Sequence, residues 1–548
     1  EEASLAQLAG LSHLLSEMPV EQRPLLWLDA YESAYRDPLI SSLNFTEGAR
    51  TSRPASQLVC CIDARSEGLR RHFENAGPHE TLGFAGFFAV AIRFRDLAGG
   101  MPSDLCPVLI DPRNEIAETA LEGEEAAAAR RVSGLNSIAA AAESFHAAES
   151  NLASPFVLAE TTGWAAGPLS AARTVSARAF GSVRRKLVDR VAPAAPTVLD
   201  VEEGFTLEER LLFGEAALTM MGLVEGFAPV VVLCGHGSTT ENNPYASALD
   251  CGACGGNPGA ANARTAAAIL NQEEVRRGLA ERGIGIPGDT LFVAAEHDTT
   301  TDRVTLLDRH LVPEDRQPEL DRIEADLATA GELLSAERSE SMPGAPRRMT
   351  PAAAARHVES RSSDWAQVFP EWGLAGNAAF VVGPRSLTAG LDLERRAFLH
   401  SYEAGADPDG KALETILTAP LIVAQWINAQ YYFSTVEPLV FGAGSKAVHN
   451  VVGGFGVLAG PGGDLQLGLP WQSVADGERL IHEPMRLLAV VQAPLGRIDS
   501  IIAENAVLQR LFNNSWLALA VRDDFNQPWM RHTAGGWQPW AEKEGTKP

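Results

Sequence analysis

Positive charge is scarce in this sequence, and the shortage excludes two classes of partner. The 548 residues include 45 Lys and Arg against 70 Asp and Glu, which gives a formal net charge of -25. An average surface of this charge repels both nucleic acid and anionic lipid. We therefore expect no nucleic-acid partner.

Long uncharged runs are nearly absent as well. The longest covers residues 415–436 (TILTAPLIVAQWINAQYYFSTV) and contains Pro420 together with Gln425, Asn428 and Gln430. A proline and three side-chain amides disfavour a helix that spans lipid. We expect this helix to be buried or to face a partner, and the chain itself not to cross a bilayer.

Cysteine is rare, and its spacing is not that of a disulfide framework. The six cysteines include an adjacent pair, Cys60 and Cys61, and a C-x-x-C formed by Cys251 and Cys254. Small secreted domains space their cysteines differently, so we expect a reducing compartment, the cytoplasm, and metal ligation. The chain also shows no signal peptide and begins with Glu, so its first residues are expected to follow a processed or missing start.

One short run, LVCCIDARSE, carries most of the chemistry. An apolar stretch ends at Ile62 and a helical pattern begins at Ser66, so Cys61, Asp63 and Arg65 fall in a strand-to-helix turn. Ligands bind at such turns in open α/β sheets. Alternation along extended backbone places these three side chains on one side and the preceding cysteine on the other.

Two further strands follow the same pattern. Residues 228–234 (APVVVLC) form an almost continuous β-branched run that leads to His236 in a Gly-His-Gly turn. Residues 290–295 (TLFVAA) are predicted to form another buried strand. Such runs are typical of strands buried on both faces. Strand, polar loop and helix recur, which predicts a parallel α/β core.

The pattern predicts three segments. Residues 1–50 are expected to be the remnant of an N-terminal region. Residues 51–310 are expected to form the zinc-binding α/β core, with an Ala-rich helical insertion at about 114–190 packed over the sheet. Residues 311–548 are expected to form an α+β C-terminal region, beyond a charged and Pro-rich joint.

The strand ends offer a set of metal ligands. Zinc sites draw on Cys and His, with a carboxylate or water completing four ligands. Cys61 and Asp63 close the first strand, His236 closes the second, and Cys251 or Cys254 ends the loop that follows. A closed Cys/Cys/His zinc knot, or buried thiols without a metal, would explain the same residues. The remaining thiols are expected in the core: Cys60, Cys106 and Cys234.

Seven blocks together resemble the DabA family, the soluble subunit of bacterial inorganic-carbon accumulation complexes. In chain order they are CIDARSE, GHGSTTENNPYASALDCGACGG, EHDTTTD, RSLTAGLDLERRAFLHSYE, TAPLIVAQWINAQYYFSTV, GAGSKAVHN and GDLQLGLPWQS. The C-x-D-x-R turn is also similar to that of β-type carbonic anhydrases, which implies a β-carbonic-anhydrase-like core sheet. Family members carry a long region ahead of this turn, and the interval between histidine and cysteine is longer here than the H-x-x-C of β-carbonic anhydrases.

The resemblance implies a metal centre with two acting residues. Zn²⁺ would be held by Cys61, Asp63, His236 and Cys251, with Arg65 as the partner of Asp63. Two thiolates and a neutral imidazole balance the zinc charge and leave one position for Asp63 or water. If Arg65 draws Asp63 away through a bidentate pair, zinc can lower the pKa of the incoming water toward ~7. Asp63 and Arg65 are thus the expected catalytic residues for hydrating CO₂.

The resemblance also implies a partner and a location. The chain would dock on the cytoplasmic side of the inner membrane, as a peripheral protein, against a DabB-like subunit of cation-antiporter type. Together they would form an energy-coupled pump for CO₂ and bicarbonate that hydrates in one direction. Residues 415–436 and 83–94 are candidate docking surfaces, although core packing explains both equally well. The alternatives are a free-standing β-type carbonic anhydrase and a non-catalytic zinc-stabilised scaffold.

Overall fold

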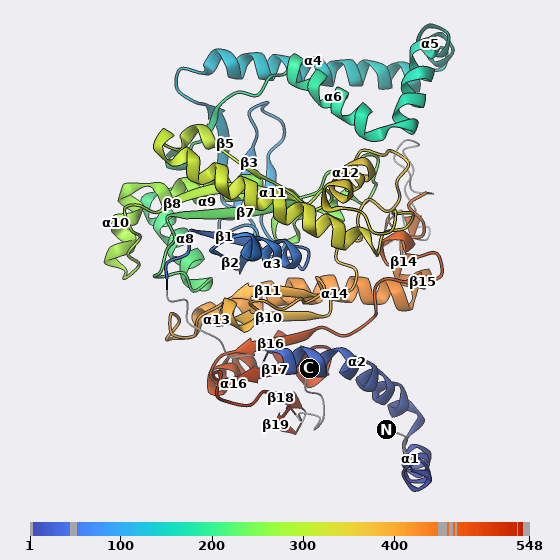
Figure 1. Ribbon diagram of the computed structural model, residues 1–548, viewed down its shortest axis with the longest axis vertical. Coiled ribbons are helices and arrows are strands. Elements are labelled where there is room, and N and C mark those ends of the chain that lie inside the picture. Colours follow the sequence, from blue (N-terminus) through green and yellow to red (C-terminus); the bar gives the residue numbers. More distant parts are fainter. Residues whose placement is uncertain are drawn as a thin grey trace.

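Two largely parallel sheets organise the chain, one above the other in Figure 1. This computed structural model describes residues 4–43, 52–447, 458–459, 464–465, 468–533 and 535–540. The expected α/β class is confirmed, whereas the finer likeness of the first sheet to β-carbonic anhydrase stays a prediction.

The first sheet holds the strand ends that carry the candidate ligands. Its order is β2-β1-β7-β8-β9. The strands are β1 (Ser56–Cys61), β2 (His79–Phe84), β7 (Val230–Gly237), β8 (Leu291–Asp298) and β9 (Arg303–Leu306). The first four in this order run parallel, and β9 returns antiparallel to β8. Since β1 pairs directly with β7, their carboxyl ends meet at one edge of the sheet.

Helices cover both faces of this sheet because its strands are apolar on both sides. Alternate residues such as Leu58 and Val232 pack on α3 (Ser66–Ala76) and α11 (Gln317–Ser339). The residues between them, including Val59 and Leu233, pack in a second cluster with α8, α9 and α10. These helices are α8 (Leu207–Met220), α9 (Ala260–Asn271) and α10 (Glu273–Glu281). Each buried strand therefore contributes side chains to two cores.

The segment boundary predicted at residue 310 would place α11 in the C-terminal region. In the structure, α11 covers one face of the first sheet. Leu320, Ile323 and Leu327 recur at helical spacing and are buried against α3 and β9. Charged residues of the same helix such as Asp321 and Arg322 are exposed, whereas Arg338 is buried and pairs with Asp302. Helix α11 thus packs with the first sheet, while the division of the chain at residue 310 stays a prediction.

The second sheet lies in the lower half of Figure 1. Its order is β11-β10-β16-β17-β18-β19. The first four strands in this order run parallel, β18 is antiparallel to β17, and β19 is antiparallel to β18. The strands are β10 (Ala379–Gly383), β11 (Ala397–Ser401), β16 (Leu488–Gln492), β17 (Ala518–Arg522), β18 (Met530–Thr533) and β19 (Gly536–Pro539). One face packs on α13 (Lys411–Thr418), α14 (Pro420–Val436), α16 (Leu495–Glu504) and α17 (Ala506–Asn513). The C-terminal region is thus mostly parallel α/β with an antiparallel hairpin, rather than the α+β arrangement expected.

The N-terminal residues cover the other face of the second sheet. Helix α2 (Arg23–Ser42) buries Leu39 and Ile40 in the same cluster as Val381 and Val490. Its Glu32 is fully buried and lies 2.6 Å from Arg486 Nη2. The N-terminal segment is therefore part of the second core, while α1 (Leu5–Glu17) ahead of it buries no residue.

The Ala-rich insertion differs from its prediction in two ways. Its first residues form strand β5 (Asn114–Ala120), and the helices begin only at Glu125. These helices project as an arm at the top of Figure 1 instead of packing over the sheet. They are α4 (Glu125–Ser150), α5 (Ser154–Val175) and α6 (Ala177–Val191). The few buried positions in the arm are small, Ala128, Gly134, Ala177 and Gly181, while large apolar side chains such as Phe156 and Trp164 are exposed.

Smaller elements complete the described fold. A four-stranded sheet of order β4-β3-β5-β6 supports the arm, with β3 (Ile92–Arg95), β4 (Ser103–Leu105) and β6 (Thr197–Leu199). The remaining helices are α7 (Val201–Gly204), α12 (Pro351–Ser362) and α15 (Pro438–Phe441). The remaining short strands are β12 (Leu458–Ala459), β13 (Asp464–Leu465), β14 (Ala475–Asp476) and β15 (Arg479–Leu480).

The two candidate docking segments differ in exposure. Most of residues 83–94 are in the interior, where Phe84, Phe88 and Ile92 are 0–1% exposed, so they do not form a surface. Among the described residues, Lys411–Val436 is the one stretch long and apolar enough to cross a membrane, and half of its most apolar window is buried in the protein. Along α14, Tyr431 is buried while Trp426 is 48% exposed, so this helix has an inner and an outer face.

The two sheets meet edge to edge at β2 and β11. Leu399 N donates a hydrogen bond to the Ile62 carbonyl (3.1 Å), and Gly83 N donates to Ser401 Oγ (2.9 Å). A Cβ atom at Gly83 would lie 1.8 Å from the Leu399 carbonyl oxygen, so only glycine permits this approach. The turn after β1 therefore lies at the junction of the two halves.

Candidate metal centre

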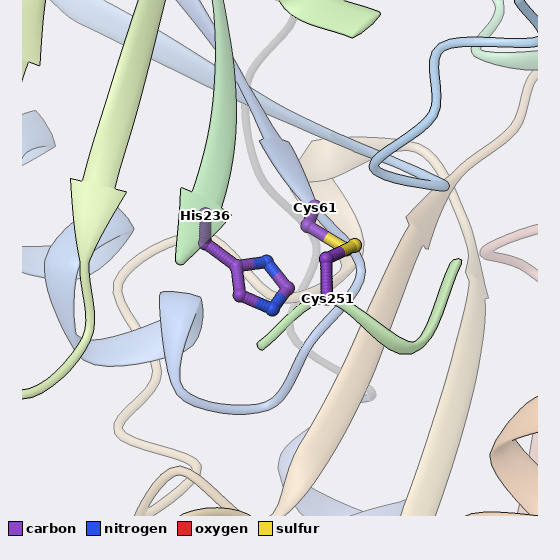
Figure 2. A group of neighbouring side chains, drawn as sticks. All are labelled: Cys61, His236 and Cys251. Carbon is purple, nitrogen blue, oxygen red and sulfur yellow. The ribbon is translucent and has the colours of Figure 1, made fainter. Parts of the chain in front are cut away.

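Three predicted ligands converge at this junction. Cys61, His236 and Cys251 offer ligand atoms that all lie within 4.8 Å of one another. Figure 2 shows the two thiols and the imidazole ring close together, with Cys61 at the end of β1 and His236 near the end of β7. All three residues are buried, with exposures of 3%, 1% and 0%. Residues far apart in the sequence thus form one Cys-His-Cys cluster that can hold a metal ion.

The loop that follows β7 brings Cys251 back to the sheet. Cys251 N donates to the Asn257 carbonyl, and Gly256 N donates to the Cys251 carbonyl, which closes a tight turn around the short helix Gly252–Cys254. Gly255 and Gly256 have φ values of 66° and 78°, a conformation that favours glycine. The glycines of LDCGACGG therefore set the position of the second thiol.

The geometry of the cluster suits zinc. Two thiolates on a tetrahedral zinc at Zn–S ≈ 2.3 Å are about 3.8 Å apart, and the Cys61 and Cys251 sulfurs are 3.9 Å apart. His236 Nδ1 is buried without a hydrogen-bond partner among the described residues, so this nitrogen is available to a metal. Soft thiolates with imidazole favour zinc over magnesium or calcium. The residues present therefore fit the metal that the sequence predicts.

The thiols stay protonated unless a cation replaces their protons. The neighbouring Cys251 thiol and burial raise the pKa of Cys61 well above its ordinary value, and the Cys254 thiol raises that of Cys251. Only the thiolate binds a metal, so metal binding at this cluster releases protons.

Gly86 gives the two sulfur atoms the space that they occupy. A Cβ atom there would lie 2.8 Å from Cys251 Sγ and 2.9 Å from Cys61 Sγ, closer than real side chains approach. Gly86 could not be singled out from the sequence, because the contact joins segments that are distant along the chain.

The variant Gly86→Ala is expected to weaken metal binding by about tenfold or more, since the new methyl group displaces one or both sulfurs. The measurement is zinc affinity by competition with a chromogenic chelator. Gly252→Ala is the matched control, because its Cβ would meet only Ile427 at 3.5 Å, an ordinary contact. Equal zinc affinities in the two variants would contradict the assignment.

Asp63 is not part of the cluster of ligand atoms and is bound by Arg65 instead. Arg65 Nε donates to Asp63 Oδ1 (2.9 Å) and Nη2 donates to Oδ2 (2.8 Å), a bidentate pair. The Arg65 backbone N–H also donates to Oδ1 at 2.9 Å. Burial alone would raise the pKa of Asp63, but the charge of Arg65 and these hydrogen bonds hold it below its ordinary value. The carboxylate is therefore ionised in this arrangement.

The bound carboxylate remains next to the predicted ligands. Asp63 Oδ2 lies 3.3 Å from His236 Nε2, and Arg65 Nη2 lies 3.2 Å from the same nitrogen. Asp63 is thus adjacent to the three clustered residues without belonging to the cluster, and its role as a fourth ligand stays a prediction.

The other end of the guanidinium group contacts residues that the sequence did not indicate. Arg65 Nη1 donates to the Leu249 carbonyl (2.6 Å), Thr299 Oγ1 (3.0 Å) and Glu371 Oε1 (3.2 Å). Thr299 lies in the EHDTTTD block, whereas Glu371 stands alone in the apolar stretch VFPEWGLAGNAAFVV. A lone acid in such a stretch is a signal that sequence reasoning could have used.

The other predicted residues lie as follows. Cys254 is fully buried but outside the cluster, and Cys60, Cys106 and Cys234 are buried in the core as expected. His297 stands opposite His236 on the neighbouring strand, but it is not among the clustered residues, and its Nε2 lies 3.9 Å from Asp302 Oδ1. The GAGSKAVHN block runs past residue 447 and so lies partly outside the described residues.

Comparison with known proteins identifies relatives over almost the whole chain. A family model described as "Probable inorganic carbon transporter subunit DabA" matches residues 3–517. A relative of that name from Salinibacter ruber is 44% identical over 539 residues, which cover 94% of this chain and 66% of the relative. Relatives of the same name from Haloarcula marismortui and Chloroflexus aurantiacus are 42% and 45% identical, and the matches cover 94% and 90% of this chain.

The matches cover only 66% and 60% of those two relatives, so the chain spans about two thirds of the length of its curated relatives or slightly less. The residues that the family model matches nevertheless include the whole first sheet, strands β10, β11 and β16 of the second sheet, and the three cysteine and histidine residues of the cluster. On this match, the chain belongs to the DabA family of inorganic carbon transporter subunits.

Proposed function

We propose that this chain is the zinc-binding, CO₂-hydrating part of an energy-coupled inorganic carbon pump. Zn²⁺ would be held by Cys61, His236 and Cys251, with Asp63 as an exchangeable fourth ligand. The observation that supports the proposal is a buried Cys-His-Cys cluster beside a bidentate Asp63–Arg65 pair. A purely structural zinc site has no need of an adjacent carboxylate that a guanidinium group can hold or release.

Zinc bound by two thiolates and an imidazole would supply an activated water at neutral pH. The residues of the chain would control access to it. Arg65 holds the Asp63 carboxylate at two oxygens, so the carboxylate does not compete for the fourth position. When Asp63 is released, it would take that position and close the site. The surrounding apolar cluster, which includes Ile62, Leu374 and Tyr431, suits CO₂, a small apolar molecule.

The proposed partner is a DabB-like membrane subunit of cation-antiporter type on the cytoplasmic face of the inner membrane. The family name describes a transporter subunit, and the outer face of α14, with exposed Trp426 and Phe433, supports contact with such a partner. The inner face of the same helix carries Tyr431, whose hydroxyl accepts a hydrogen bond from Leu374 N beside the site. In the proposal, docking stabilises the Asp63–Arg65 pair and so permits hydration in one direction only.

The variant Asp63→Ala tests the proposal. It is expected to keep about one zinc per chain on three ligands and to lose carbon uptake in cells that also make the membrane subunit. The measurements are zinc content of the purified chain, CO₂ hydration with and without the partner, and growth or uptake at low CO₂. Asp289→Ala is the matched control, because Asp289 pairs with Arg53 on the surface, far from the cluster.

The outcomes separate the alternatives. Normal uptake in Asp63→Ala would remove Asp63 from the mechanism. Hydration by the isolated chain would favour a free-standing carbonic anhydrase. Full burial of the cluster favours a second candidate, a non-catalytic zinc-stabilised scaffold. That candidate predicts zinc in the chain without hydration in either the isolated chain or the complex.

A further inference from the structure

Glu371 is a buried carboxylate that shares Arg65 with Asp63. It is 3% exposed and lies in the loop between α12 and β10, in the C-terminal half of the chain. Its Oε1 atom accepts hydrogen bonds from Arg65 Nη1 (3.2 Å), from Thr299 Oγ1 (2.8 Å) and, at 3.4 Å, from Thr300 Oγ1. One oxygen atom thus joins the guanidinium group to the turn after β8.

We infer that Glu371 is a positioning residue that holds Arg65 in the orientation in which it withdraws Asp63 from the metal. The inference rests on the proposed function and assigns Glu371 a part in the control of the same site. Glu371 does not touch the ligand cluster, so it acts only through Arg65.

The hydrogen bonds of Arg65 explain why its orientation needs support. The guanidinium group uses Nε and Nη2 for Asp63 and leaves Nη1 for Leu249, Thr299 and Glu371. A planar guanidinium group cannot turn without moving both ends together. Anchoring Nη1 therefore fixes the edge that faces Asp63, and losing the anchor lets Asp63 return to the metal.

A second cation lies beside the loop that carries Glu371. Lys446 is 4% exposed, and its Nζ donates a hydrogen bond to the Val368 carbonyl at 3.0 Å. Burial lowers the pKa of Lys446 to about 8, although the charge of Glu371 opposes this shift. Two buried carboxylates, Asp63 and Glu371, are thus accompanied by two basic groups, Arg65 and Lys446.

The test uses the full chain in complex with its membrane partner and loaded with Co²⁺, whose visible spectrum reports on the ligands, with azide as the probe of a free fourth position. The unchanged chain is expected to bind azide with a spectral change. Glu371→Ala is expected to bind azide at least about tenfold more weakly. This fold-change corresponds to the loss of one buried hydrogen bond to a charged group. Glu371→Gln, which keeps the accepting oxygen, is expected to recover most of this loss.

The effect must disappear when Asp63 is absent. In an Asp63→Ala background, adding Glu371→Ala is expected to leave azide affinity unchanged, because no carboxylate remains to return to the metal. If Glu371→Ala does not fold, Thr299→Val removes the hydroxyl that bridges Glu371 and Arg65. It is expected to weaken azide binding in the same direction.

The possible results are distinguishable. Azide affinity that is unaltered by both Glu371→Ala and Thr299→Val would overturn the inference, and so would an equal loss in the Asp63→Ala background. A cobalt-loaded chain that binds no azide would also overturn it, because Glu371 would then not keep Asp63 off the metal. An unchanged chain that binds neither cobalt nor zinc would instead contradict the proposed function.

Discussion

Cys251→Ser is expected to weaken zinc binding by more than about 100-fold. Changing a residue that only supports a metal ligand costs up to about 100-fold in affinity, and losing the ligand itself should cost more. Cys251 supplies one of two sulfur atoms that are 3.9 Å apart, and a serine hydroxyl is a poor replacement for a thiolate on zinc. Zinc content after dialysis, together with affinity by chelator competition, measures the effect. The cluster retains only Cys61 and His236 in this variant.

Cys254→Ser is the matched control for that loss. Both thiols belong to the same C-x-x-C and both are fully buried, so the general effect of placing a hydroxyl in the interior is similar. Cys254 lies outside the cluster of ligand atoms, and its variant is expected to keep about one zinc per chain. If Cys251→Ser retains zinc and Cys254→Ser loses it, Cys254 rather than Cys251 would be the zinc ligand.

Arg65→Ala is expected to destabilise the chain by about 3–5 kcal/mol, the cost of leaving a buried charge without its partner. Asp63 and Glu371 both lose their cation, and neither is more than 7% exposed. The measurement is the urea midpoint and slope of unfolding of the metal-free chain. Zinc is expected to restore part of the stability, because Asp63 can then bind the metal.

Arg53→Ala provides the comparison for an exposed pair. Arg53 and Asp289 form an ion pair at 2.6 Å, but their side chains are 39% and 58% exposed. Solvent screens such pairs, so the expected loss is about 1 kcal/mol or less. A loss in Arg65→Ala no larger than this would mean that the buried pair carries no special role in the fold.

The residues of the Cys-His-Cys cluster could be predicted because two of them follow local rules of strand ends. Cys61 and His236 each lie at the carboxyl end of a buried strand, and parallel strands bring such ends together. Cys251 needed a choice between two thiols, which the sequence alone left open. The turn geometry of LDCGACGG brings Cys251 rather than Cys254 into the cluster, and that geometry is a property of the folded loop.

The residues that sequence reasoning missed act across long distances. Gly86 matters because of two sulfurs from other segments, and Glu371 because of a guanidinium group from the first strand-to-helix turn. A local pattern can mark Glu371 as unusual, but it does not show which distant residue such a side chain contacts. The same limit explains α11, whose surface charge suggested a new domain although its apolar stripe belongs to the first sheet.

The edge-to-edge contact of the two sheets has a consequence during synthesis. Strand β2 is complete at Phe84, but its neighbour β11 is not translated until residues 397–401. At about 5–20 residues per second, the edge of β2 stays uncovered for on the order of tens of seconds. An unpaired edge strand is a template for aggregation. The nascent chain should therefore depend on holdase chaperones during that interval, and slowing translation between the two strands should lower the soluble yield.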